Sequence, residues 1–205
     1  MKININQNLP IFYLITFFLV FIVLAISPKY RYMWFIENII IIITILILIC
    51  TYKKFRFTNL SYTLFFIYAI IVEIGAHYTY AEVPIHFLVN LFDWQRNHFD
   101  RIVHFSYGFL LAIPFSEIFQ KTSKIKSNFW IFLVPILIIF TTGAIYEIIE
   151  CMFAVLSNPN ASEAFLGSQG DVWDAQKDMF FAGVGACLSM VIYYIFKNKV
   201  TQKDS

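Results

Sequence analysis

Six long apolar segments constrain the fold of this chain more than any other feature, because the core of a soluble domain does not need so many apolar segments of this length. They lie near residues 9–27, 34–52, 59–78, 101–119, 129–151 and 176–196. Each is as long, or nearly as long, as the roughly 20 residues with which a helix crosses about 30 Å of hydrocarbon. The composition agrees, since 60% of the 205 residues are hydrophobic and only 14% are charged, against about half and a quarter in soluble domains. We therefore expect an all-α, polytopic integral membrane protein with six transmembrane helices in one bundle.

No linker or internal repeat divides the chain, so a single structural domain is expected. Residues 1–58 hold two helices without motifs, residues 59–196 hold four helices that carry the polar motifs, and residues 197–205 form a basic tail. Two connections are long, at 79–100 and 152–175. Binding and catalytic groups often lie on such connections. The first of them has a pattern that favours a short interfacial or re-entrant helix.

The basic residues are sorted between the two sides of the predicted bundle. With a cytoplasmic N-terminus, only Lys29, Arg31, Arg96 and Arg101 lie outside, and Lys177 lies at a boundary. Because cytoplasmic segments carry the excess of Lys and Arg, this pattern predicts that both termini are cytoplasmic. Both long connections then lie on the outer side of the membrane. The ten basic residues expected inside are Lys2, Lys53, Lys54, Arg56, Lys121, Lys124, Lys126, Lys197, Lys199 and Lys203.

Tryptophans lie near the ends of the predicted helices, at positions 34, 94, 130 and 173. Trp is enriched where a membrane meets water. We therefore interpret these residues as an interfacial aromatic belt. Glu37 and Glu117, also near helix ends, are likewise expected at the membrane surface.

Acidic and histidine side chains of four predicted helices fall at one depth in the outer half of the bundle. A charged group near the bilayer centre costs at least about 2.5 kcal/mol on insertion scales, so such residues often have a function. Residues spaced by three, four or seven share one face of a helix. The convergence predicts a polar pocket that opens outward. Its four groups are Glu73 with His77; Asn97, Asp100 and His104; Glu147 with Glu150; and Asp171, Asp174 and Asp178.

Each of these features also has a structural explanation. Asp171 and Asp174 stand near a helix N-terminus, where negative charge is favourable. Lys177 would pair with Asp174 or extend to water, and Arg101 would balance nearby carboxylates. The small residues between 182 and 189 predict close helix packing. Taken together, however, so many carboxylates call for cations, protons or a metal.

The first functional hypothesis is a membrane-embedded enzyme, metal-dependent or acid–base, that acts on a lipid-linked or cell-envelope substrate. A divalent metal fits this hypothesis: His with carboxylates suits Zn²⁺ or Mn²⁺, and carboxylates alone suit Mg²⁺ or Ca²⁺. The predicted catalytic residues are Glu147, Glu150, Asp174, Asp178 and His104. Substrate binding is assigned to Arg96, Asn97, Arg101 and Lys177, and metal binding to Glu73, His77, Asp100, His104 and Asp171.

Two other hypotheses stay open. A small transporter or proton-coupled carrier would line its outer vestibule with the same residues, although no inverted repeat is visible and the inner half has only Glu117. A scaffold or sensing component would use them to hold helices together. Nucleic-acid binding is disfavoured, because membrane topology and anionic lipid headgroups explain the basic residues. Membrane lipid is the expected partner.

Four motifs resemble those of the YjdF-type bacterial inner-membrane proteins, a family defined as a domain of unknown function. They are HYTYAEVP (77–84), RNHFDRIVHFSYGFLLA (96–112), YEIIE (146–150) and GDVWDAQKDM (170–179). The resemblance implies a multi-pass protein of the bacterial plasma membrane and brings no activity with it. A looser pattern is similar to VanZ-like membrane proteins. It comprises Asp100 with His104, Glu147 with Glu150, and Asp171 to Asp178 before Gly183.

Overall fold

The computed structural model describes residues 5–156 and 170–203, and every secondary-structure element within them is a helix. Five of the helices are long and apolar enough to cross a membrane, and α1 adds a shorter apolar stretch, Asn8–Leu24. The predicted all-α membrane class is therefore confirmed, with five candidate spans. The helices are α1 (Ile5–Leu24), α2 (Arg31–Thr51), α3 (Asn59–Tyr78), α4 (His86–Leu91), α5 (Phe99–Thr122), α6 (Asn128–Leu156) and α8 (Asp174–Lys203).

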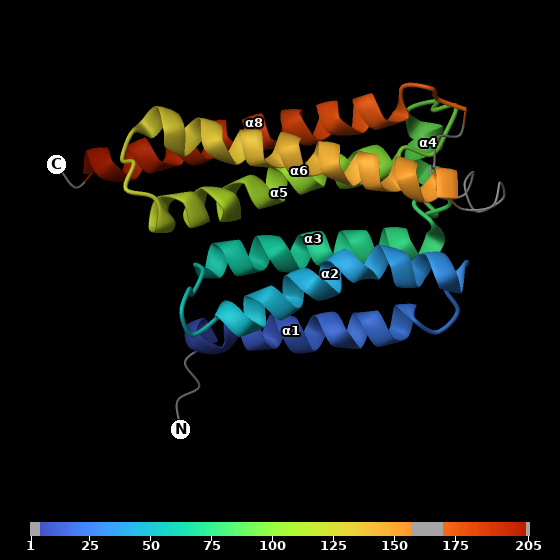
Figure 1. Ribbon diagram of the computed structural model, residues 1–205, viewed down its shortest axis with the longest axis horizontal. Coiled ribbons are helices and arrows are strands. Elements are labelled where there is room, and N and C mark those ends of the chain that lie inside the picture. Colours follow the sequence, from blue (N-terminus) through green and yellow to red (C-terminus); the bar gives the residue numbers. More distant parts are fainter. Residues whose placement is uncertain (1–4, 157–169, 204–205) are drawn as a thin grey trace.

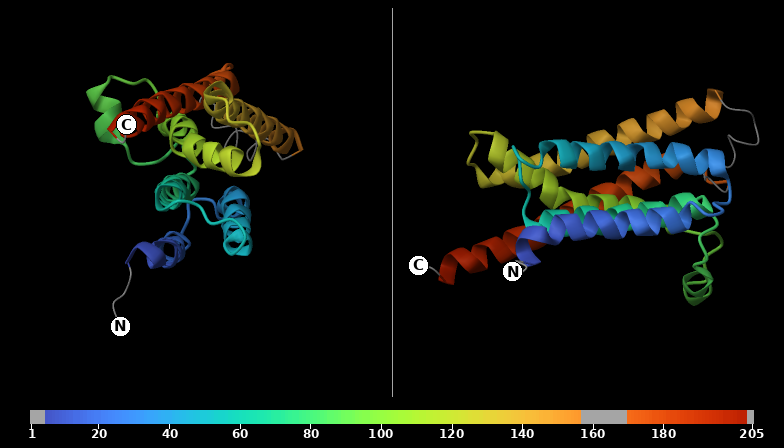
Figure 2. Two further views of the ribbon diagram at one scale, coloured as in Figure 1. Left: turned by 90° about the vertical axis from the view of Figure 1, so that its left-hand side faces the viewer. Right: turned by 90° about the horizontal axis from the view of Figure 1, so that it is seen from below.

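The long helices run side by side, and consecutive ones run in opposite directions (Figures 1 and 2). Figure 1 shows α5, α6 and α8 on one side of the bundle and α1, α2 and α3 on the other. The start of α1 and the end of α8 lie at the same end. At the other end, α3 and α6 end while α5 and α8 begin. We call this second end the polar end, because the predicted site residues lie there.

Close contact between α5 and α8 is the tightest packing in the bundle. A Cβ atom on Gly108 of α5 would lie 1.8 Å from the Ala182 carbonyl oxygen. A Cβ atom on Gly185 of α8 would lie 2.2 Å from the Phe105 carbonyl oxygen. Ala182 and Ala186 are fully buried beside them. The small residues predicted to allow close packing do so, because any larger side chain would separate the two backbones.

The two long connections differ in how far they are described. The connection between α3 and α5 contains the short helix α4, which stands beside the bundle in Figure 2. A short helix is therefore present where the pattern predicted one. Its Phe87 and Leu91 side chains are both well exposed. In the other connection, α6 continues to Leu156, further than expected, and residues 157–169 lie outside the described residues.

Trp34 departs from the predicted aromatic belt. Its side chain is only 3% exposed, and its ring packs against Phe21 with the centroids 5.0 Å apart. Its indole N–H donates a 2.8 Å hydrogen bond to Oε1 of Glu73. Trp34 is therefore part of the contact between α2 and α3 and does not lie in an interfacial belt. The Glu73 carboxylate provides the acceptor that the buried indole N–H needs. Trp130 and Trp173 are exposed, as a belt requires.

Candidate functional site

The turn before α5 is ordered by Asn97. Its Oδ1 atom accepts a 2.9 Å hydrogen bond from the Phe99 backbone N–H, and its Nδ2 atom donates a 2.8 Å bond to the Val83 carbonyl. Asp100 then lies in the first turn of α5, where the helix dipole favours negative charge. The predicted substrate-binding residue Asn97 thus also holds the α3–α5 connection against the start of the helix.

Three aspartates are brought to one face of α8 by the turn that precedes it. Gly170 adopts a positive φ of 85°, a conformation that glycine accepts without strain. Asp171 then closes the turn: its Oδ1 atom accepts from the Trp173 backbone N–H at 3.1 Å, and its carbonyl accepts from the Asp174 N–H at 3.2 Å. Asp174 begins the helix and Asp178 follows one turn later. The predicted stripe of aspartates is therefore present.

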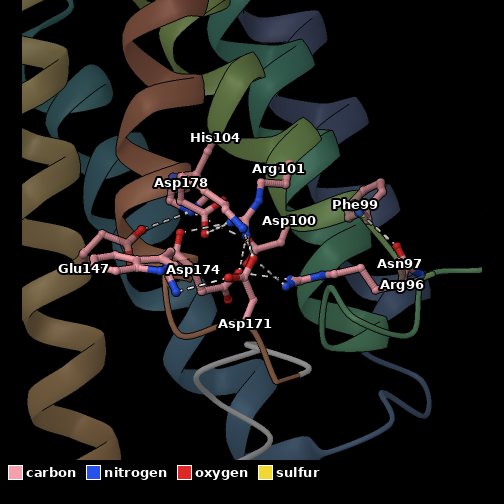
Figure 3. Close-up of polar contacts among 12 residues, drawn as sticks. Arg96, Asn97, Phe99, Asp100, Arg101, His104, Glu147, Asp171, Asp174 and Asp178 are labelled. Atoms are coloured by element: carbon pink, nitrogen blue, oxygen red, sulfur yellow. Dashed lines mark hydrogen bonds and ion pairs between the residues drawn. The ribbon is translucent and has the colours of Figure 1, made fainter. Parts of the chain in front are cut away.

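Arg101 connects this stripe to α5 (Figure 3). One guanidinium nitrogen, Nη2, lies 3.1 Å from Oδ2 of Asp171 and also pairs with Oδ1 of Asp174. The other, Nη1, donates a 3.0 Å hydrogen bond to the Asp174 carbonyl and pairs with Oδ2 of Asp178. Arg101 is buried. A planar guanidinium suits such a contact, because its donors are fixed in a fork that matches carboxylate oxygens.

Arg96, which is largely buried, and the exposed Lys177 complete the basic half of this network. Arg96 places Nη1 3.4 Å from Oδ2 of Asp171 and Nη2 3.0 Å from Oδ1 of Asp174. The Lys177 ammonium lies 2.6 Å from Oδ2 of Asp171. That hydrogen bond, together with the one from the Trp173 N–H, lowers the pKa of Asp171 to about 2. These predicted substrate-binding residues are therefore already paired with carboxylates of the same chain.

His104 lies on the inner side of this network, between carboxylates from two helices. Its Nε2 atom is 3.7 Å from Oδ1 of Asp100, one turn earlier on α5, and 3.4 Å from Oε1 of Glu147 on α6. The imidazole also packs edge-on against Tyr146, with the ring centroids 6.0 Å apart. His104 and Glu147 are both buried. The structure thus brings together predicted site residues from α5, α6 and α8.

Two buried carboxylate oxygens at this point accept no hydrogen bond from any described residue. They are Oδ1 of Asp178, which is 2% exposed, and Oε1 of Glu147, which is 9% exposed. Nearly all buried polar atoms in proteins have a partner, and one left without a partner calls for an explanation. One oxygen or nitrogen from each of Asp100, His104 and Asp178 lies within 4.8 Å of the others. These three residues, with Glu147, are the candidates to hold a metal.

The site has more acidic than basic side chains. Five carboxyl groups belong to it, and the three basic side chains Arg96, Arg101 and Lys177 form ion pairs with Asp171, Asp174 and Asp178. Among the described residues, no Lys or Arg forms an ion pair with Asp100 or Glu147, and His104 is the basic side chain within 4 Å of them. The part of the site around His104 therefore has more acidic than basic side chains.

The predicted metal ligands Glu73 and His77 are not brought into this site. Glu73 is fully buried and bonded to the Trp34 indole, as described above. The Nδ1 atom of His77 lies 2.7 Å from the Leu24 carbonyl at the end of α1. The predicted pocket of four helices is thus corrected to one of three, because this face of α3 meets α1 and α2 and not α5.

Glu150 belongs to a second polar group that the sequence did not reveal. Its charge interacts with that of Glu37, which had been expected at the membrane surface. The Tyr80 and Tyr146 hydroxyls both donate to Oε2 of Glu37, at 3.3 and 3.2 Å. Burial raises the pKa of Tyr80 well above its usual value. No spacing connects Glu37 to these partners, because they come from three separate segments of the chain.

The carboxylate of Glu117, at the opposite end of the bundle, has a different environment. Its Oε1 atom accepts from the Thr58 backbone N–H at 2.8 Å and from the Lys121 ammonium at 2.6 Å. Its Oε2 atom accepts from the Thr58 hydroxyl at 2.9 Å and the Ser61 hydroxyl at 2.5 Å. Both oxygens are thus occupied, and Glu117 attaches α5 to the start of α3.

Comparison with known proteins supports the predicted resemblance. A family model described as a predicted membrane protein, DUF2238, matches residues 9–199. The chain belongs to this family. The inner membrane protein YjdF of Escherichia coli (strain K12) is 34% identical over 180 residues, which cover 86% of this chain and 85% of the relative. No solved structure matches the chain.

Membership of the DUF2238 family confirms a multi-pass membrane protein and names no activity. The match begins at residue 9 and so includes α1 and α2, which carry none of the quoted motifs. The looser likeness to VanZ-like proteins is not tested by this match and stays a pattern.

Proposed function

We propose that the protein is a membrane-embedded enzyme that performs acid–base chemistry at the outer face of the bacterial plasma membrane. The observation that carries this proposal is the position of His104 Nε2, 3.7 Å from Asp100 and 3.4 Å from Glu147. A buried imidazole beside carboxylates is suited to accepting and donating protons. In this proposal Glu147 and His104 exchange protons with the substrate, and Asp100 orients the imidazole.

The Arg101 network supports this role by holding the centre in place. Arg101 fixes Asp174 and Asp178 of α8 against α5, next to His104. A catalytic group works best when packing and neighbouring hydrogen bonds restrict it to one geometry. We therefore interpret Asp171, Asp174, Arg96 and Arg101 as a frame around the centre, and not as groups that meet the substrate first.

An outward orientation of the polar end follows from the distribution of basic residues. In a bacterial plasma-membrane protein, the connections richer in Lys and Arg lie on the cytoplasmic side. The connections at the opposite end carry Lys53, Lys54 and Arg56, and then Lys121, Lys124 and Lys126. With α1 as a sixth span, both termini lie in the cytoplasm. The His104 centre then faces headgroups and envelope components on the outer side.

A lipid-linked substrate is favoured by a shallow apolar groove on α8, beside Phe140 of α6. The groove has a volume of about 470 Å³ and begins at Phe180, two residues after Asp178. It lies within the candidate spans, where the surroundings are hydrocarbon. A chain in this groove would bring its headgroup toward the polar end. The lining residues are Phe140, Phe180, Gly183, Val184, Cys187, Leu188 and Val191.

A non-catalytic scaffold is the second candidate, and the Arg101 contacts favour it, because they join α5 to α8 whether or not the site binds a substrate. A proton-coupled carrier is less well supported. Such a path would need a protonatable group near the opposite end, where Glu117 is held by four hydrogen bonds.

The test compares the envelope lipids of cells that lack the protein with those of cells that express wild-type, His104→Gln, Glu147→Gln or Glu117→Gln protein. General acid–base catalysis contributes roughly 10²–10⁴-fold to a rate. We therefore expect one lipid-linked species to accumulate without the protein and with the first two variants, and to disappear with wild type and Glu117→Gln. If mass spectrometry finds no such species while all variants are present in the membrane, the enzyme proposal fails.

A further inference from the structure

We propose that Asp100, His104, Asp178 and Glu147 bind one divalent metal ion, of the class of Zn²⁺ or Mn²⁺. The inference deepens the proposed function, on which any catalytic role of the ion rests: with an ion bound, His104 and Glu147 would serve as its ligands, and a water on the ion would supply the acid–base chemistry. Binding of the ion is a separate property, which can be measured without knowledge of the substrate.

The distances within the group fit a metal centre. Zinc and manganese bonds to nitrogen and oxygen ligands are about 2.1 Å long, so neighbouring ligand atoms of a tetrahedral site lie about 3.4 Å apart. His104 Nε2 is 3.4 Å from Oε1 of Glu147 and 3.7 Å from Oδ1 of Asp100. The candidate atoms of Asp100, His104 and Asp178 all lie within 4.8 Å of one another. Side-chain movements of roughly an ångström would close the set around an ion.

The unpartnered oxygens are independent evidence for a ligand. Oδ1 of Asp178 and Oε1 of Glu147 are buried, and no described residue donates a hydrogen bond to either. A buried carboxylate oxygen without a donor is costly. A cation between them and His104 would satisfy both oxygens. The Glu117 carboxylate, with four donors, has no such need.

Arg101 determines which oxygen of Asp178 is left for the ion. Its Nη1 atom pairs with Oδ2 of Asp178, so Oδ1 stays free. A residue that hydrogen-bonds the second oxygen or nitrogen of a metal ligand orients that ligand and changes its affinity for the metal. Arg101 therefore acts as a positioning residue. The Asp100 and Glu147 carboxyl groups, deprotonated when they bind the ion, supply the attraction that offsets the positive charge of Arg101.

The mixture of one imidazole with carboxylates decides the class of metal. Imidazole suits Zn²⁺ and Mn²⁺ with carboxylates, whereas Mg²⁺ and Ca²⁺ prefer oxygen ligands alone. The structure also changes the ligand set expected from the sequence. Glu73 and His77 contact other helices, and Asp171 pairs with Arg96, Arg101 and Lys177.

The experiment is metal titration of the full chain, purified in detergent, stripped with a chelator and supplied separately with ZnCl₂, MnCl₂ and MgCl₂. We expect about one Zn²⁺ or Mn²⁺ per chain by mass spectrometry, and a Kd at least tenfold tighter than for Mg²⁺. His104→Gln and Glu147→Gln should weaken binding by 100-fold or more. Neither residue pairs with Arg101, so both variants should keep the frame intact.

The matched controls are Glu117→Gln and Glu73→Gln, which remove a partly buried and a fully buried carboxylate outside the group and should leave the stoichiometry unchanged. The inference is overturned if stripped wild type binds none of the three metals and no metal raises its thermal stability, or if the controls lose the ion as His104→Gln does. Binding without any accumulated lipid would defeat the enzyme proposal alone. Lipid turnover that depends on His104 without bound metal would defeat the metal inference alone.

Discussion

The carboxylates at the two ends of the bundle differ in how completely they are hydrogen-bonded. At the opposite end, both oxygens of Glu117 accept hydrogen bonds from backbone, hydroxyl and ammonium donors of α3 and α5. At the polar end, Asp178 and Glu147 each keep one buried oxygen without a donor. Both regions join helices, but Glu117 has a donor for each oxygen, whereas Asp178 and Glu147 do not.

The difference teaches that burial of an acid does not by itself indicate a site. Glu117 is explained by the donors to both of its oxygens. Glu73 accepts from the Trp34 indole through Oε1, while its Oε2 atom, like those of Asp178 and Glu147, has no donor among the described residues. The group around His104 differs from both, because its candidate ligand atoms come from α5, α6 and α8 and lie close together. An unmet hydrogen bond therefore indicates a candidate site only where several ligand atoms converge. The following variants test that distinction, from the largest expected effect to the smallest.

Arg101→Gln should cause the largest loss of stability. It leaves Asp174 and Asp178 buried without their cation, and breaking a buried ion pair from one side costs about 3–5 kcal/mol. Chemical denaturation in mixed micelles would measure the change. Arg31→Gln is the control, because Arg31 lies at the same end but donates only to the exposed Ala25 carbonyl. Equal stability of the two variants would contradict the assigned role of Arg101.

Gly108→Ala should cost about 1–3 kcal/mol, as overpacking of a tight contact does. The added Cβ atom would meet the Ala182 carbonyl at 1.8 Å and push α8 away from α5. Because the same two helices carry Arg101 and Asp178, metal binding should weaken as well. Gly143→Ala is the matched control, since nothing lies within 4 Å of its added Cβ atom. A thermal unfolding midpoint that falls equally in both variants would exclude this explanation.

Glu117→Gln should destabilise the protein by about 1–2 kcal/mol, because a neutral amide weakens the charge-assisted bonds from Lys121 and Thr58. Lipid turnover and metal binding should not change. Proteolysis of the connection before α3 would report the loosened contact. If the variant instead loses metal, the two ends are coupled and the comparison between them does not hold.

Glu73→Gln should have an effect below about 1 kcal/mol. The amide oxygen still accepts from the Trp34 indole, and a buried charge is removed. Differential scanning fluorimetry in detergent would measure the unfolding midpoint, and Trp34→Phe would serve as the variant that removes the donor. A large loss with Glu73→Gln would show that the carboxylate has a role beyond this hydrogen bond.

Lys177→Ala should have the smallest effect, and mainly in acid. The Lys177 hydrogen bond is the largest of the interactions that lower the pKa of Asp171 to about 2, against a usual value of 3.8. Because the pKa of the folded state is the lower one, this contribution is present above pH 3.8 and is lost as the pH falls to about 2. The unfolding temperature should therefore fall less between neutral pH and about pH 2 in the variant than in wild type. Identical pH profiles would contradict the pairing.

The membrane class and the membership of the site were predictable where they depend on local spacing. Apolar segments of helical length predicted the six long helices, five of which meet the criteria for spans. The i, i+4 spacing placed Asp174 with Asp178 on one face of α8 and Asp100 with His104 on one face of α5, whereas Asp171 reaches the same group through the turn before α8. These relations follow from the period of the helix alone.

Only the tertiary structure decided which helix each polar face meets. Glu73 and His77 have the spacing of a metal pair, yet they bond to Trp34 and to the end of α1. Glu37 has no sequence signal and bonds to Tyr80 and Tyr146. Helical period determines that residues share a face, but the direction of that face depends on packing between helices, such as the close approach that Gly108 and Gly185 allow. That packing lets Arg101 take one oxygen of Asp178 and leave the other free.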